Sequence, residues 1–355
     1  MIENFSKFLA ATFLGLMVLA GAGSASAQRA YIANETDNTV SVIDIATDAV
    51  IATIPVGAQP HGVAVSPNGA RVYVANFDSR NISVIDAASK VVTATISLAD
   101  RPQGMSIAPN GTRLYVALSD KVAVIDTASH AVLANVALGK FSSANAISPD
   151  GARLYALHWD TGEISVIDTS TNTVDATITG LAWPNRIAVS PNGARAYVTG
   201  YNTAALYVID TGSNAVTHVA IPVQPTGVAV TPDGAYVYVT NRADVIVVDT
   251  ATNMIVDTIT GLSNPSEIGL TPTGHRAYVT NPSSSFVTVI DTATKAVVGH
   301  VSVGQRPKAA GPFIGPAPSS PPAAVPTMGE WAMILLGVVL AAGAALTVQR
   351  RRMAA

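Results

Sequence analysis

The chain has 355 residues, of which 12% are charged, and its formal net charge is −3 at pH 7. This charge balance argues against a nucleic-acid-binding protein, because such proteins carry a clustered basic face. The chain contains no cysteine, which excludes disulfides, thiol nucleophiles, zinc–thiolate sites and c-type haem attachment.

The first 27 residues have the layout of a secretory signal peptide. Lys7 precedes an apolar run over residues 8–21, and the small residues Ala25, Ser26 and Ala27 follow it. We therefore expect signal peptidase to remove residues 1–27. Because Glu3 offsets the charge of Lys7, an uncleaved anchor helix is the alternative.

One pattern recurs every 40 to 42 residues between residues 28 and 315. Seven tyrosines and seven aspartates mark it: Tyr31, Tyr73, Tyr115, Tyr155, Tyr197, Tyr238 and Tyr278, and Asp44, Asp86, Asp126, Asp168, Asp210, Asp249 and Asp291. Each unit predicts four short strands, which read TGVAVTP, AYVYVTN, VIVVDT and NMIVDTIT in one unit. A turn such as TPDG or SPNG joins the first two strands. Each repeated aspartate ends the third strand, and we expect it to bond the backbone of the following turn.

The two ends of the array indicate how it closes. Four strands every forty-odd residues are typical of a β-propeller, and a β-solenoid is the alternative. The first unit begins at its second strand, AYIAN, and an unmatched segment, QRPKAAGPFI, follows the last unit. A solenoid needs caps, whereas a ring needs a split unit of this kind. We therefore predict an all-β, seven-bladed propeller of four-stranded blades, in which the C-terminal strand completes the N-terminal blade.

The C-terminal end differs in composition. Residues 316–324 are rich in Pro, Ala and Ser and predict an exposed linker. An apolar run over residues 332–348 precedes Arg350, Arg351 and Arg352. As a helix it would be roughly 26 Å long, enough to span a bilayer, with the arginines on the cytoplasmic side. This predicts a propeller outside the cytoplasmic membrane.

The repeats resemble a known family. The sequence YVTN at residues 238–241 and 278–281, with close variants at residues 31–34 and 73–76, is similar to the motif of the YVTN family of β-propeller repeat proteins. The resemblance covers nearly all of residues 28–315 and implies the fold. The family occurs in cell-surface and surface-layer proteins, and related propellers include lactonase-like enzymes.

Residues 325–355 resemble a second family, the IPTL-CTERM sorting signal of Gram-negative bacteria. Pro326, Thr327, Glu330 and Trp331 match its motif. Val325 and Met328 replace the usual Ile and Leu, and Ala332 stands where Gly is usual. The resemblance implies recognition and cleavage by an exosortase-type transpeptidase. A plain membrane anchor is the alternative.

Candidate binding residues lie where each unit begins its first strand, at the expected mouth of the central channel. The residues at this place are all polar and differ from one another: His61, Gln103, Ser143, Asn185, Thr226, Ser266 and Lys308. Arg186 and Glu267 follow two of them, where other units have Gly or Ala. A varied polar ring indicates a ligand site, although strand starts beside a wet channel are polar in any case.

The loops between second and third strands should open on the same face. They carry Phe77, Trp159 and Tyr201, with His158 and Asp160 beside the tryptophan, and Trp183 precedes a first strand there. Exposed aromatics beside charged groups are typical of a binding surface.

Two functions follow from this pattern. The first is a non-catalytic binding module of the periplasm or cell surface, with an envelope polysaccharide or protein as its ligand. The alternative is a lactonase-like hydrolase at the channel mouth, for which Glu267, Asn145, Asn185 and His61 are the candidates. The six histidines show no metal-ligand spacing, and one carboxylate is few for a metal site. The sequence therefore favours binding, without a cofactor.

Overall fold

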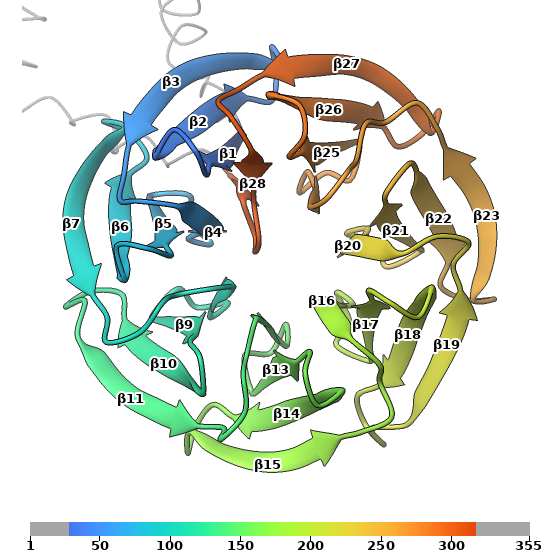
Figure 1. Ribbon diagram of the computed structural model, residues 1–355, viewed down its shortest axis with the longest axis horizontal. Coiled ribbons are helices and arrows are strands. Elements are labelled where there is room, and N and C mark those ends of the chain that lie inside the picture. The colour runs from blue at the N-terminus through green and yellow to red at the C-terminus, as the bar shows by residue number, and fades with distance from the viewer. Residues whose placement is uncertain (1–27, 317–355) are drawn as a thin grey trace, which may run out of the picture. The chain divides into compact units, whose positions relative to one another are not determined.

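The computed structural model describes residues 28–316. The predicted signal peptide, sorting motif and C-terminal transmembrane helix lie outside the described residues. Residues 28–316 contain no helix long and apolar enough to cross a membrane. They form seven antiparallel sheets arranged as blades around a central axis (Figure 1), as predicted.

Each blade runs from an innermost first strand to a fourth strand at the rim. Blade 1 contains β28 (Pro307–Lys308), β29 (Ile314–Gly315), β1 (Arg29–Asn34), β2 (Thr39–Asp44) and β3 (Ala49–Pro55). Blade 2 contains β4 (Pro60–Val65), β5 (Arg71–Asn76), β6 (Asn81–Asp86) and β7 (Val91–Ser97). Blade 3 contains β8 (Met105–Ile107), β9 (Arg113–Ala117), β10 (Lys121–Asp126) and β11 (Val132–Ala137). Blade 4 contains β12 (Ala144–Ile147), β13 (Arg153–His158), β14 (Glu163–Asp168) and β15 (Thr173–Ile178).

The remaining blades repeat this order. Blade 5 contains β16 (Pro184–Val189), β17 (Arg195–Gly200), β18 (Ala205–Asp210) and β19 (Val216–Ala220). Blade 6 contains β20 (Pro225–Val230), β21 (Tyr236–Asn241), β22 (Val245–Asp249) and β23 (Met254–Ile259). Blade 7 contains β24 (Ile268–Leu270), β25 (Arg276–Asn281), β26 (Phe286–Asp291) and β27 (Ala296–Ser302).

The second and third strands of each blade form the core. In β5 and β6 nearly every residue is buried on both faces, because neighbouring blades cover both sides of the sheet. Val, Ile and Tyr suit such a strand, since branched and aromatic side chains pack well on a pleated surface. The outer strand β7 is exposed along most of its length.

The C-terminal segment closes the ring as predicted. β28 pairs with β1 through Ala33 and Lys308, and β29 pairs with β1 through Arg29 and Gly315. The sequence predicted one continuous strand, but the structure has two short ones. The residues between them bend towards blade 2, where the N–H of Val63 donates to Ala310 O at 3.2 Å.

The same segment reaches blade 7. Phe313 is fully buried, and a Cβ added to Gly269 would lie 2.6 Å from its ring. The closing segment therefore contacts blades 1, 2 and 7 and joins both ends of the array.

The repeated aspartate has the structural role that the sequence predicts. Oδ1 of Asp168 accepts the N–H groups of Ser170 at 2.8 Å and Thr171 at 3.0 Å, together with the Ser170 hydroxyl. These hydrogen bonds, led by the one from the Ser170 side chain, lower the pKa of Asp168 to about 2. Equivalent bonds occur in the other six units, at Asp44, Asp86, Asp126, Asp210, Asp249 and Asp291.

Arginine side chains join neighbouring blades, a feature that the sequence analysis missed. Arg113 of blade 3 donates to the carbonyl of Thr169 in blade 4 at 2.9 Å. Arg153 of blade 4 donates to Thr211 O in blade 5 at 2.8 Å. Arg29, Arg71 and Arg195 make the same contact. Arg276 also makes it, to Ile45 O at 3.4 Å across the junction of blades 7 and 1, and in addition pairs with Asp48.

Candidate functional site

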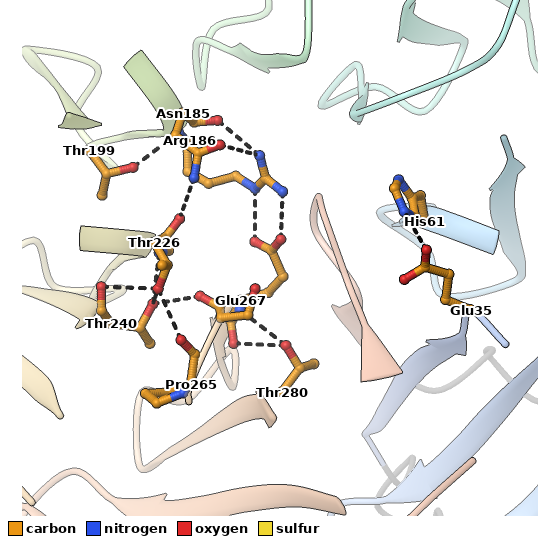
Figure 2. Close-up of polar contacts among 12 residues, drawn as sticks. Glu35, His61, Asn185, Arg186, Thr199, Thr226, Thr240, Pro265, Glu267 and Thr280 are labelled. Atoms are coloured by element: carbon orange, nitrogen blue, oxygen red, sulfur yellow. Dashed lines mark hydrogen bonds and ion pairs between the residues drawn. The ribbon is translucent and has the colours of Figure 1, made fainter. Parts of the chain in front are cut away.

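The first strands present their initial residues to the central channel, where Arg186 and Glu267 meet. Arg186 lies on β16 of blade 5, and Glu267 directly precedes β24 of blade 7. Nε of Arg186 donates to Glu267 Oε2 at 2.9 Å, and Nη2 donates to Oε1 at 2.6 Å (Figure 2). The remaining guanidinium nitrogen, Nη1, donates to the Asn185 carbonyl at 2.9 Å and to its Oδ1 at 3.0 Å.

This ion pair is largely withdrawn from water. Glu267 is 4% exposed. Burial works against its charged form, but the charge and hydrogen bonds of Arg186 outweigh burial, so the pKa of Glu267 lies below its ordinary value. Burial likewise opposes the charge on Arg186, and Glu267 raises the pKa of Arg186 above its ordinary value. Both side chains are therefore held ionised.

Threonine hydroxyls hold the backbone beneath the pair. Thr199 Oγ1 accepts the N–H of Arg186 at 3.0 Å, and Thr280 Oγ1 accepts the N–H of Glu267 at 3.0 Å. In blade 6, Thr240 Oγ1 accepts the N–H of Gly227 at 2.7 Å. These are the threonines of the YVT sequences in blades 5 to 7. Their place in the repeat motif could therefore have identified these hydrogen bonds from the sequence.

A second charged group lies across the channel mouth, as Figure 2 shows. Nε2 of His61 lies 3.4 Å from Glu35 Oε1, and Nε of Arg306 lies 3.6 Å from Oε2 of the same carboxylate. Burial lowers the pKa of His61 and outweighs the opposing effect of Glu35, and Lys308 lowers it further. His61 is therefore neutral near pH 7. The sequence analysis missed Glu35, because only its contact with His61 in the folded chain gives it a role.

A cavity of about 270 Å³ lies at this mouth. Its lining includes predicted residues from four blades, namely His61, Gln103, Ser143, Trp159, Asn185 and Arg186, and adds Gly104, Phe141 and Ala310. The other predicted residues do not line it: Phe77, Trp183, Tyr201, Thr226, Ser266, Glu267 and Lys308. Phe77 adjoins His61, with ring centroids 5.5 Å apart, and Tyr201 accepts a hydrogen bond from Arg242 at 2.9 Å.

The tryptophans come together beside the cavity. The rings of Trp159 and Trp183 are 5.3 Å apart at an angle of 31°, and the ring of Phe141 meets Trp159 edge-on at 6.0 Å. Trp159 is 40% exposed and Trp183 43% exposed. We call Phe141, Trp159 and Trp183 the aromatic ledge.

Comparison with known proteins places the chain in a family. Residues 17–313 match the model of the YNCE-like β-propeller family. The chain belongs to this family. Residues 323–352 match the IPTL-CTERM motif, in agreement with the resemblance of the C-terminal segment. No functionally curated protein matches the sequence.

Solved structures similar to this YNCE-like propeller share its architecture. Hydrazine synthase of Kuenenia stuttgartiensis is 25% identical, with a TM-score of 0.69 over 74% of this chain and 92% of that chain. A functionally unknown protein from Desulfotomaculum acetoxidans is 15% identical, with a TM-score of 0.70 over 81% of this chain and 98% of that chain. The dihydro-heme d1 dehydrogenase NirN is 15% identical, with a TM-score of 0.60 over 77% of this chain and 63% of that chain.

Two sequence candidates have structural roles in the YNCE-like propeller. His158 was expected on an exposed loop, but it is buried, with Nε2 2.8 Å from Ser165 Oγ and Nδ1 3.0 Å from Phe141 O. It replaces the asparagine of YVTN, since Asn76 makes the corresponding bond to Ser83 Oγ. Asn145 is also buried, and its amide donates to Tyr115 O at 3.3 Å.

A larger cavity, of about 580 Å³, lies among the turns between first and second strands of blades 5 and 6. Its polar side chains are already committed within the YNCE-like fold. Arg195 donates to Thr250 O, Ser190 to Asn192, and Thr231 to Asp233. We therefore place the candidate site at the channel mouth. Within residues 28–316, no three His, Asp or Glu side chains are grouped to hold a metal ion.

Proposed function

We propose that this chain is an exported envelope β-propeller that acts as a non-catalytic binding module, with its ligand site at the channel mouth. The observation that supports the site is the meeting of side chains from five blades around one cavity, beside exposed tryptophans. Varied polar groups on a rigid scaffold are the usual composition of a binding site.

The C-terminal motif supports export and surface association. We propose signal peptidase and an exosortase-type transpeptidase as the processing partners, with the C-terminal helix as the membrane anchor before cleavage. The domain limits at residues 27, 315 and 324 are part of this proposal.

A matched pair of variants tests which face binds. The purified chain is incubated with envelope fractions of its native host, and the bound share is measured by sedimentation. We expect Gln103→Glu with Trp159→Glu to weaken binding at least about tenfold, because both carboxylates enter the cavity. The control, Asn68→Asp with Asn192→Asp, adds the same charge on the opposite face, where Asp150 and Asp233 already occupy the equivalent turns.

Two results would contradict this function. One is a wild-type chain that binds no envelope fraction. The other is an equal loss of binding in both double variants, because charge alone would then explain the effect.

The hydrolase alternative rests on His61 and Glu35. A neutral histidine beside a carboxylate is the arrangement of an oriented general base. Hydrazine synthase and NirN, two of the similar structures, are enzymes by name. Hydrolysis of a lactone or ester panel by the purified chain, lost in His61→Ala, would favour this alternative over simple binding.

A further inference from the structure

Contacts between neighbouring loops hold the residues of the aromatic ledge in place. A Cβ added to Gly162, in the loop that follows Trp159, would lie 2.0 Å from Leu181 O, and Gly162 has φ of +71°. The N–H of Leu181 donates to Gly162 O at 3.2 Å. The loop carrying Trp159 is therefore bound directly to the loop carrying Trp183.

Phe141 is fixed by a separate contact. Nδ1 of the buried His158 lies 3.0 Å from its carbonyl oxygen. Trp183 itself has φ of +53°, a conformation that bulky residues rarely adopt. The equivalent places in blades 2, 7 and 1 also have positive φ, but they hold Gln59, Asn264 and Arg306. Blade 5 thus accepts a strained tryptophan where other blades have polar side chains.

The cavity at the foot of the ledge offers neutral hydrogen-bonding groups. The amide of Gln103 lines the cavity and makes no side-chain hydrogen bond within residues 28–316. The Asn185 amide also lines it, but its Nδ2 donates to Thr226 O at 3.0 Å and its Oδ1 accepts from Arg186. The charge on Arg186 is matched by Glu267, and burial keeps His61 neutral. Lys308, the further cation at the mouth, does not line the cavity.

The aromatic ledge and the neutral groups of the cavity together indicate the class of ligand. The face of an indole ring carries partial negative charge, so it attracts the weakly positive C–H groups on the flat side of a sugar ring. Hydroxyl groups at the edge of that ring need donors and acceptors without net charge, which amides supply. A strongly charged ligand would find no unpaired ion in the cavity lining to offset its desolvation.

We infer that the mouth site takes a neutral saccharide chain, with a sugar ring lying on the exposed side of the packed pair Trp159 and Trp183 and with hydroxyls reaching the amide of Gln103. This inference rests on the proposed binding function and names its ligand class. It assigns the aromatic ledge to stacking and the cavity to hydrogen bonding.

Tryptophan fluorescence tests the inference directly. The chain has three tryptophans, so in the full-length protein carrying Trp331→Phe the two ledge residues are the only indoles. Neutral hexasaccharides of glucose, mannose and galactose are titrated, with hexagalacturonate as the charged counterpart. We expect a neutral hexasaccharide to shift the emission and to bind at least about tenfold more tightly than the uronate.

Substitutions then assign the contact. By calorimetry, Trp159→Ala and Trp183→Ala should each weaken binding at least about tenfold, Trp159→Phe should weaken it less, and Gln103→Ala should weaken it without touching the ledge. Val223→Ala, at an exposed apolar residue outside the ledge, should bind as the wild type does. Unchanged melting shows that each variant is folded.

The results that would overturn the saccharide inference differ from those that would overturn the proposed binding function. Equal saccharide binding by wild type and both alanine variants would overturn the inference, as would preference for the uronate. It would also be overturned if envelope binding persisted through the mouth while no neutral saccharide bound, since the ligand would then be a protein or a charged polymer. The binding module itself would stand in that last case.

Discussion

The carboxylate of Glu267 and the guanidinium of Arg186 meet over a blade that neither belongs to. They are 81 residues apart and lie in blades 5 and 7. Blade 6 has Gly227 at the equivalent place, where a Cβ would lie 2.3 Å from Ser266 O. Glycine at this place therefore lets the backbone of Ser266 and Glu267 in blade 7 approach the first strand of blade 6 closely.

Loss of one partner of this pair should cost far more than loss of both. We expect Arg186→Ala to lower the free energy of unfolding by about 3–5 kcal/mol, because it leaves a buried carboxylate without a counter-charge. Arg186→Ala with Glu267→Ala should recover part of this loss, since Ala144 and Ala309 occupy the same place in other blades. Urea unfolding measures both, and a double variant less stable than the single one would refute the pairing.

The same pair predicts a loss of stability in acid. Burial opposes the charge on Glu267, but Arg186 holds its pKa below the ordinary 4.5 in the folded chain. A lowered folded pKa stabilises the fold above about pH 4.5, and this contribution disappears as the pH falls towards the folded value. Unfolding curves between about pH 6 and 3 should therefore fall more steeply for wild type than for the double alanine variant. Parallel curves would contradict this.

Ring closure depends on the last described strands. Ending the chain after residue 303 removes β28, β29 and Phe313, and exposes β1 as an unpaired edge. We expect a lower melting temperature and aggregation, because such an edge pairs with other chains. The control chain ends after residue 316 and should melt as the full chain does. If the two truncated chains melt alike, the closing segment does not stabilise the ring.

The arginine contacts between blades should each contribute measurably. We expect Arg113→Ala to lower the free energy of unfolding by about 1–2 kcal/mol, since it removes a charged donor from the Thr169 carbonyl. Arg101→Ala is the matched control, because its ion pair with Asp78 is exposed and such pairs contribute about 0–1 kcal/mol. Chemical denaturation compares them, and an equal cost would argue against a role in joining blades.

Processing of the C-terminal segment is tested by mass. Residues 323–352 match the IPTL-CTERM motif. If an exosortase-type enzyme processes the chain as proposed, we expect protein extracted from the envelope of the native host to lack residues 332–348. A chain carrying Pro326→Ala and Thr327→Ala should keep them. An intact mass that includes the apolar run in the unaltered protein would instead indicate a plain membrane anchor.

Much of the architecture could be predicted from single residues at regular spacing. Tyr238 and Asp249 recur in every unit because a buried strand and a hydrogen-bonded turn make the same local demand seven times. The closing segment was recognisable because it aligns with first strands elsewhere in the chain. Its bend towards Val63 was not, since that depends on how close blade 2 lies.

The candidate site, too, could be predicted from the sequence only in part. The unusual residues Arg186, Glu267 and His61 stood out against the repeat, but their pairing did not. Glu35 went unnoticed because its importance comes only from the neighbour it faces. His158 was misjudged because an asparagine-like bond to Ser165 is visible only in the folded blade.

The sequence by itself determined the number of blades, their strand order and the split blade that closes the ring, because these follow from local periodicity and turn chemistry repeated along the chain. Only the tertiary structure decided which side chains share the channel mouth. The curvature of the ring brings Arg186 to Glu267 across blade 6 and Trp159 to Trp183 across two loops. Such distances arise from the packing of whole blades, and no local pattern in the sequence encodes them.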